Sequence, residues 1–176
     1  MDIVPLKLSD VKKITPRTFS DERGFFRETF RLSDYAAAGI GPSFPQDNHS
    51  FSKRGVIRGM HFQRYPGQAK LVSVVSGQIF DVVVDVRKES PTYGLWEGVY
   101  LDSIVGVQLW IPVGFAHGFC VVSEEAHVLY KVSSPYASAE EKSFCYNDPF
   151  VGIRWPCSAP TLSDRDRQAP YLENIL

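Results

Sequence analysis

Apolar and polar positions alternate with a period of two over several stretches of this chain. In the clearest stretch, residues 78–87, the even positions from 80 on are apolar, whereas the odd positions include Asp81 and Asp85. Successive side chains of a strand point to opposite faces, so the pattern predicts a strand with one core face and one acidic face. A second β-type run covers residues 70–75, and the intervening Ser76-Gly77 predicts a two-residue hairpin turn.

Similar short runs recur further along the chain, and helical signals are few. Turn residues separate these runs, which lie at 108–112, 118–122 and 127–132. Ser33 or Asp34 is predicted to cap a brief helix that stops at Gly39, and Ser163 is predicted to cap another near the C-terminus. Many strands with little helix indicate an all-β protein, and a jelly-roll sandwich or barrel is the best match.

Composition is typical of one globular domain, and we treat residues 1–176 as a single unit. Hydrophobic residues make up 44% and charged residues 22% of the chain. The N-terminus lacks the apolar run of a signal peptide, and no stretch is long enough to span a membrane, so we expect a cytoplasmic protein. A net charge of −1 argues against nucleic acid as a partner, and an anionic ligand would need local cations.

Two of the four histidines are candidates for chemistry. His61 lies in RGMHFQ, where alternation would place it on a small polar face, opposite Arg58; the alternative is a core histidine. His117 closes IPVGFAHG, a pattern similar to the second metal-binding motif of cupins. Metal-binding cupins also need a paired HxH, which this sequence lacks, so we expect no metal site.

Other polar residues have both structural and functional interpretations. Tyr130 is either a packed strand residue or a proton donor. Asp166 either completes the cap that begins at Ser163 or orients a histidine. Most charged residues of this kind are solvated, but Arg58 lies in an otherwise apolar run and so needs a partner, which favours an anion site here more than at the other cations. The chain contains neither GxGxxG nor GxxxxGK, so neither of these phosphate cradles is available.

Several motifs together resemble those of the dTDP-4-dehydrorhamnose 3,5-epimerase family. They occur in the family's order from about Val11 to Pro170, and they are FSDERGFFRETF, QDNHSFSKRGVIRGMHFQ, KLVSVVSGQIFDVVVDVRKESPTYG, QLWIPVGFAHGF, LYK and LSDRD. The resemblance implies a cupin-like jelly roll, a homodimer, and neither metal nor organic cofactor. It also implies a reaction, the inversion of C3 and C5 of dTDP-4-dehydro-6-deoxyglucose to give dTDP-4-dehydrorhamnose.

The resemblance also implies roles for individual residues. His61 is the expected general base, Asp166 its orienting carboxylate, and Tyr130 the acid on the opposite face of the sugar. Lys70 and His117 would face the developing enolate, where a positive charge favours the transition state. Asp81 is the expected partner of His117. The residues that fall where the family holds the nucleotide, phosphates and sugar are Arg23, Glu28, Gln46, Asn48 and Arg58.

One departure from the family and three alternative functions stay open at this stage. After LYK the family commonly has two adjacent tyrosines, whereas here Pro135 precedes a single Tyr136, which leaves the preference for thymine undecided. A mono-epimerase acting at C3 or C5 alone would share the same catalytic residues. A metal-dependent cupin is disfavoured by the missing HxH. A non-catalytic sugar-binding jelly roll is disfavoured because binding alone does not require the combination of His61, Tyr130 and Asp166.

Overall fold

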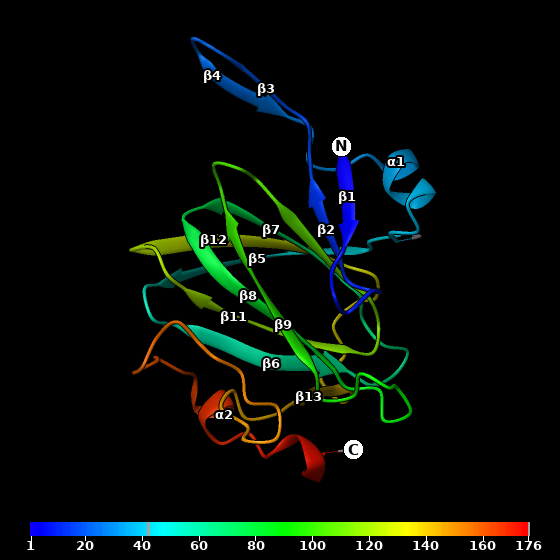
Figure 1. Ribbon diagram of the computed structural model, residues 1–176, viewed down its shortest axis with the longest axis vertical. Helices are drawn as coiled ribbons and strands as arrows, with labels where there is room; N and C mark the ends of the chain where they lie inside the picture. Colours follow the sequence, from blue (N-terminus) through cyan, green and yellow to red (C-terminus); the bar gives the residue numbers. More distant parts are fainter. Residues whose placement is uncertain (42, 176) are drawn as a thin grey trace.

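The computed structural model describes residues 1–41 and 43–175, and it shows two antiparallel sheets stacked as a sandwich (Figure 1). In order across the six-stranded sheet, the strands are β1 (Asp2–Pro5), β2 (Lys12–Thr15), β10 (Gln108–Ile111), β7 (Lys70–Ser76), β12 (Glu125–Val132) and β5 (Gln46–Lys53). Across the five-stranded sheet they are β13 (Glu141–Ser143), β6 (Ile57–Gln63), β11 (Phe115–Val121), β8 (Gln78–Asp85) and β9 (Trp96–Asp102). The predicted all-β, cupin-like jelly roll is thereby confirmed.

Strand β8 is buried on both faces, contrary to the prediction of a single core face. Val83 belongs to the apolar cluster between the two sheets. Val82 and Val84 belong to a second cluster on the outer side of the five-stranded sheet, which the C-terminal segment covers with residues such as Phe144 and Leu172. Alternation could not reveal this covering segment because it lies about sixty residues further along the chain. Asp81 and Asp85 are consequently buried as well.

The predicted hairpin at Ser76-Gly77 is wrong, because β7 and β8 lie in different sheets. β7 pairs with β10 and β12, whereas β8 pairs with β11 and β9. Gly77 has a φ of +81° and lies so close to Glu125 that an added Cβ would collide with the Glu125 carbonyl oxygen. A tight Ser-Gly turn serves equally well to pass from one layer to the next, so the sequence alone did not distinguish the two connections.

Two short helices lie where the sequence predicted them. The first, α1 (Leu32–Ala37), begins two or three residues earlier than expected, with Arg31 at its N-cap instead of Ser33 or Asp34, and Gly39 follows its end with a φ of +72°. The second, α2 (Asp164–Arg167), has Ser163 as its N-cap, as predicted, and the hydroxyl oxygen accepts the Asp166 N–H at 3.1 Å. A 3₁₀ turn, η1 (Leu172–Asn174), follows. Among the described residues, no helix is both long and apolar enough to traverse a lipid bilayer.

A hairpin of β3 (Thr18–Asp21) and β4 (Gly24–Arg27) projects from the sandwich (Figure 1). Its apolar side chains are unusually exposed, with Phe19, Phe25 and Phe26 accessible over 51%, 56% and 68% of their surface. The base of the hairpin is tied to the body by Arg27, whose guanidinium donates to the carbonyl oxygen of Ile104 at 2.6 Å. Exposed aromatic surface on a projecting arm is typical of a contact with another chain.

Candidate active site

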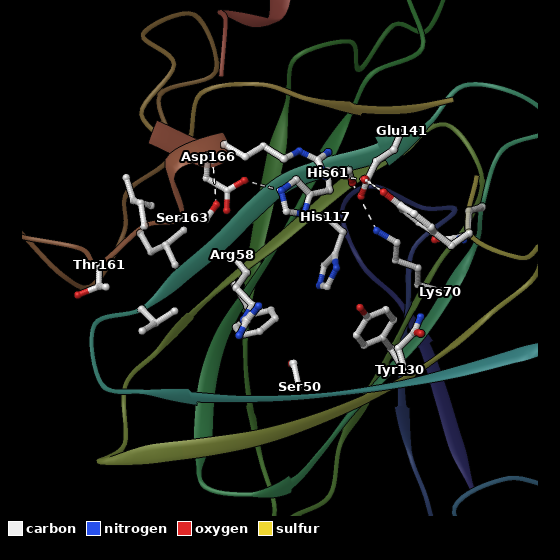
Figure 2. A pocket seen from close by; sticks show the side chains of 18 of the residues that line it. Ser50, Arg58, His61, Lys70, His117, Tyr130, Glu141, Thr161, Ser163 and Asp166 are labelled. Carbon is white, nitrogen blue, oxygen red and sulfur yellow. Dashed lines mark hydrogen bonds and ion pairs between the residues drawn. The ribbon is translucent and has the colours of Figure 1, made fainter. Parts of the chain in front are cut away.

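A cavity of about 640 Å³ opens between the two sheets, and it collects most of the predicted site residues. Figure 2 shows its side chains converging from both walls. The five-stranded sheet supplies Arg58, His61, His117, Phe119 and Glu141. The six-stranded sheet supplies Gln46, Asn48, Ser50, Lys70 and Tyr130. The C-terminal segment adds Thr161, Ser163, Arg165 and Asp166.

His61 and Asp166 form a hydrogen-bonded pair at one wall of this cavity. The His61 Nε2 lies 2.6 Å from Asp166 Oδ1, and the Gly59 N–H donates to Asp166 Oδ2 at 3.5 Å. Burial opposes ionisation of Asp166, but hydrogen bonds from His61, Ser163 and Gly59 outweigh it and lower the pKa of this carboxyl below its ordinary value. The two interpretations of Asp166 are therefore compatible, because its backbone completes the Ser163 cap while its carboxylate holds His61.

His117 and Asp81 form a second, deeper pair next to the first. His117 is the partner of His61 across β11 and β6, and its Nε2 lies 2.8 Å from Asp81 Oδ2. Burial lowers the pKa of His117 and raises the pKa of Asp81, each against the attraction of the other group. Among the described residues, Asp81 Oδ1 has no hydrogen-bond partner, so the buried carboxyl group behind the cavity is hydrogen-bonded through one oxygen only.

Lys70 and Tyr130 reach the cavity from the opposite sheet. Lys70 is only 8% exposed, its Nζ donates to the His61 carbonyl oxygen at 3.4 Å, and burial lowers its pKa to about 8 against the attraction of Glu141 and Asp81. Burial likewise raises the pKa of Tyr130, so the phenol keeps its proton at neutral pH. In Figure 2, Tyr130 lies across the cavity from His61, with Lys70 to one side between them.

Arg58 lies on the same side of β6 as His61, so the predicted alternation of faces fails at this point. The pairing of β6 with β11 shifts register between His117 and Phe119, which is a β-bulge that redirects the side chains. Gly59, between the two functional residues, has a φ of +138°, and a Cβ on it would lie 2.6 Å from the Gly118 Cα. The Arg58 guanidinium is oriented by Ser52, whose hydroxyl oxygen accepts from Nε at 2.9 Å.

Two predicted substrate-binding residues lie outside the cavity of their own chain. Arg23, in the turn of the projecting hairpin, has an 85% exposed side chain and pairs with Asp21 at 2.6 Å. Glu28 follows the hairpin and pairs with Arg31 at 2.6 Å. By contrast, the side chains of Gln46 and Asn48 line the cavity together with those of Arg58 and the catalytic candidates. Asp81, which was also predicted to contribute to the site, does not line the cavity and contacts His117 from behind.

The sequence did not single out two cavity residues, Glu141 and Arg165, that form one network with Tyr136 at the rim. Glu141, in β13, accepts a hydrogen bond from the Tyr136 hydroxyl at 2.8 Å and pairs with Arg165. Arg165 had a signal, because it stands next to Asp166 in the LSDRD motif, whereas Glu141 lies in a charged stretch typical of any exposed surface. Among residues 1–41 and 43–175, no three His, Cys, Asp or Glu side chains are grouped closely enough to hold a metal ion.

Comparisons with known proteins point in one direction. Residues 5–174 match the family described as dTDP-4-dehydrorhamnose 3,5-epimerase. A protein of that name from Shigella flexneri is 47% identical over 168 residues, which cover 94% of this chain and 93% of the relative. A dTDP-4-dehydrorhamnose 3-epimerase from Streptomyces niveus is 43% identical over 98% of this chain and 84% of its own. Among solved structures, the dTDP-6-deoxy-D-glucose-3,5-epimerase from Legionella pneumophila, in complex with dTDP-4-keto-L-rhamnose, superposes on this chain with a TM-score of 0.96. It is 44% identical in sequence, and the match covers 99% of this chain and 94% of the Legionella chain.

Proposed function

The chain belongs to the dTDP-4-dehydrorhamnose 3,5-epimerase family, and we propose that it inverts C3 and C5 of dTDP-4-dehydro-6-deoxyglucose to give dTDP-4-dehydrorhamnose. One observation carries the proposal at the level of atoms. A histidine–aspartate pair and a protonated tyrosine approach one cavity from facing sheets, with a buried lysine between them. This is the set of groups that inversion beside a ketone requires, namely a base, an acid on the other side, and a cation at the oxygen.

His61 is the base in this proposal, and its geometry indicates which nitrogen acts. Its Nε2 is engaged by Asp166 at 2.6 Å, so Nε2–H donates to the carboxylate and Nδ1 has the free lone pair. Nδ1 takes the proton from the carbon beside the C4 ketone, and the C–H electron pair moves into the enolate. Asp166 fixes the imidazole ring and stabilises the imidazolium that forms, as a buried carboxylate does for other catalytic histidines.

Lys70 stabilises the negative charge that the enolate oxygen acquires. The ammonium is held in a buried site, where a charge interacts more strongly than in water. His117 lines the cavity beside it, and its Nε2 is held by Asp81, so the one N–H of the neutral imidazole is already engaged and Lys70 is the group that stabilises the oxygen. Because full negative charge exists only after deprotonation, the ammonium favours the transition state over the bound ketone.

Tyr130 completes the inversion by giving its proton to the enolate carbon from the side opposite His61. A raised pKa makes the phenol a weaker acid, but it also keeps the phenol protonated at neutral pH, so the proton is in place for this step. The tyrosinate then regains a proton from solvent, and the imidazolium of His61 loses one, so the enzyme returns to its starting state. The net reaction transfers no electrons to the protein, so it requires no redox cofactor.

The decisive experiment is incubation of the protein with dTDP-4-keto-6-deoxyglucose in heavy water, followed by NMR. Deuterium at both C3 and C5, with conversion to the rhamno configuration, is the expected result. His61→Ala should abolish the exchange, because no other group takes the proton. Exchange at the wild-type rate in His61→Ala would refute the assignment of the base. Elemental analysis of the same active preparation tests the expectation that no metal is required.

A mono-epimerase is the second candidate, and one comparison favours it. The Streptomyces niveus relative, at 43% identity, is named a 3-epimerase, so proteins this similar differ in the number of carbons they invert. The heavy-water experiment separates the two candidates, because a mono-epimerase would retain label at one inverted carbon alone. Repeating the assay with a substrate that has uridine in place of thymidine would determine the nucleobase preference that Pro135 and Tyr136 leave open.

We further propose that the protein is a cytoplasmic homodimer in which each hairpin β3–β4 serves the partner's cavity. Arg23 and Glu28 are expected substrate ligands, yet within one chain they lie away from the cavity, and the hairpin exposes three phenylalanines. A second copy would cover this apolar surface and would receive the two charged residues. Nucleic acid is not an expected partner, because the chain has a net charge of −1.

Mixing two inactive variants tests this exchange of hairpins. Arg23→Ala and His61→Ala are denatured and refolded together, so that half of the dimers combine one chain of each kind. If Arg23 acts across the dimer, each mixed dimer has one intact site, and about a quarter of the wild-type activity returns. If Arg23 acts within its own chain, every site has a lesion and no activity returns. A monomer in sedimentation analysis would also refute the proposal.

A further inference from the structure

The segment 133–140 connects β12 with β13, and its residue Tyr136 lies at the mouth of the cavity. The phenol oxygen of this tyrosine donates a hydrogen bond to Glu141 at 2.8 Å. The other end of the residue is fixed through the backbone, because the Tyr136 N–H donates to the Gln46 side-chain oxygen at 3.0 Å. The position of this segment therefore determines the shape of the mouth and the orientation of the tyrosine ring.

The next backbone amide is held from the opposite sheet. The Ala137 N–H donates to the Gln63 side-chain oxygen at 3.1 Å. Gln46 belongs to β5 of the six-stranded sheet, whereas Gln63 belongs to β6 of the five-stranded sheet. Two consecutive backbone N–H groups of the segment are thus hydrogen-bonded to two glutamine side chains, one from each sheet of the sandwich. We call this arrangement the glutamine clamp.

Gln63 is itself fixed in place, so it can act as an anchor. Its side chain is only 7% exposed, and its Nε2 donates to the Ser134 hydroxyl at 3.5 Å. The Gln68 amide donates both to the Gln63 oxygen at 3.4 Å and to the Ser134 carbonyl oxygen at 2.9 Å. A buried amide whose donors and acceptor are occupied has one preferred orientation, because rotating it would leave buried polar groups unpaired.

We propose that Gln63 is a positioning residue for substrate binding, which acts through the glutamine clamp to hold Tyr136 ready at the mouth of the cavity. The proposal rests on the proposed function, since it concerns binding of the same nucleotide-linked sugar. A segment that is already ordered loses less conformational entropy when the ligand binds. Gln63 does not act on the reacting carbons, so loss of the clamp weakens binding and leaves the proton-transfer steps in place.

Gln63→Met tests the proposal, because methionine has a similar length but lacks the amide that grips Ala137. We expect KM for dTDP-4-keto-6-deoxyglucose and Kd for dTDP to rise about tenfold, while kcat stays within about twofold. Hydrogen–deuterium exchange in the peptide 133–140 should accelerate in the same variant. Gln78→Met, the same substitution at the start of β8, should leave KM, Kd and this exchange unchanged.

Each outcome has a definite meaning. An unchanged KM and Kd, or a fall in kcat at constant KM, would overturn the positioning role. Faster exchange without a change in binding would do so as well, because it would reduce Gln63 to a structural residue. Gln63→Asn retains an amide but withdraws the acceptor by one methylene group, so it carries the test if the methionine variant does not fold. If the wild type fails to epimerise the sugar, the proposed function is refuted. The role of the glutamine clamp is still tested in that case, by comparing Kd for dTDP and amide exchange in the wild type and in Gln63→Met.

Discussion

Replacing Lys70 by methionine removes a buried charge and keeps the length of the side chain. Burial lowers the pKa of this lysine from 10.5 to about 8, against the attraction of Glu141 and Asp81. One pKa unit is worth about 1.4 kcal/mol, so the charged form costs the folded protein about 3 kcal/mol at neutral pH. We therefore expect Lys70→Met to be more stable than the wild type at pH 7, while its kcat falls by about 10²–10³ for lack of a cation at the enolate oxygen.

The sign of the pH dependence follows from proton binding. Between the folded pKa of about 8 and the unfolded value of 10.5, the unfolded chain binds a proton at Lys70 that the folded protein has released. Stability of the wild type therefore rises with pH in this window, and the burial cost returns as the pH falls through 8. Other groups titrate in both proteins, so the difference between wild type and variant isolates Lys70.

Urea denaturation at pH 7, 8, 9 and 10 measures this difference. We expect the advantage of Lys70→Met to shrink by about 2.5 kcal/mol between pH 7 and pH 10. Lys131→Met provides the control, because Lys131 forms a surface pair with Asp47 and should change stability by less than about 1 kcal/mol at any of these pH values. A difference that stays flat with pH would show that Lys70 keeps an ordinary pKa, and the reasoning from burial would be refuted.

Four further outcomes follow from the same geometry. The wild-type kcat should decline above pH 8 as Lys70 loses its proton, which a pH–rate profile measures. Asp166→Asn should lower kcat by about 10²–10⁴ and leave Kd for dTDP unchanged in calorimetry, because it disturbs the orientation of His61 alone. Tyr130→Phe should retain deuterium exchange but lose net inversion by NMR. Gly59→Ala should lower the free energy of unfolding, measured by thermal denaturation, by more than about 2 kcal/mol, because the added Cβ would lie 2.6 Å from Gly118 Cα. Gly55 also has a positive φ, +77°, but has open space around it, so the control Gly55→Ala should lower the free energy of unfolding by only about 1–2 kcal/mol.

The fold class was predicted from local patterns, whereas most of the cavity residues were predicted from the resemblance of several motifs to one family. Alternation identified the strands, and the turn residues separated them. The RGMHFQ, LYK and LSDRD motifs led to His61, Tyr130 and Asp166, although their convergence on one cavity is a property of the folded chain. The Ser163 cap was likewise predictable, since its hydrogen bond to Asp166 spans only three residues.

The errors have a common cause, which is that long-range packing overrides local signals. Ser76-Gly77 looks the same whether the next strand joins the same sheet or the opposite one. The face of Arg58 was mispredicted because a bulge against β11 depends on a strand nearly sixty residues away. Glu141 was missed because its partners, Tyr136 and Arg165, come together only when the C-terminal segment folds back over the five-stranded sheet.

The division of the site between two separate sheets has a consequence for how such enzymes diverge. The proposed base His61 lies in the five-stranded sheet, with Asp166 in α2 beside it, whereas the proposed acid Tyr130 lies in the six-stranded sheet, so each can be altered by substitutions in its own layer. A change that moves the phenol by a fraction of an ångström would leave proton abstraction intact and deprive one carbon of its return proton. Relatives that invert a single centre could arise in this way without any loss of the ancestral base.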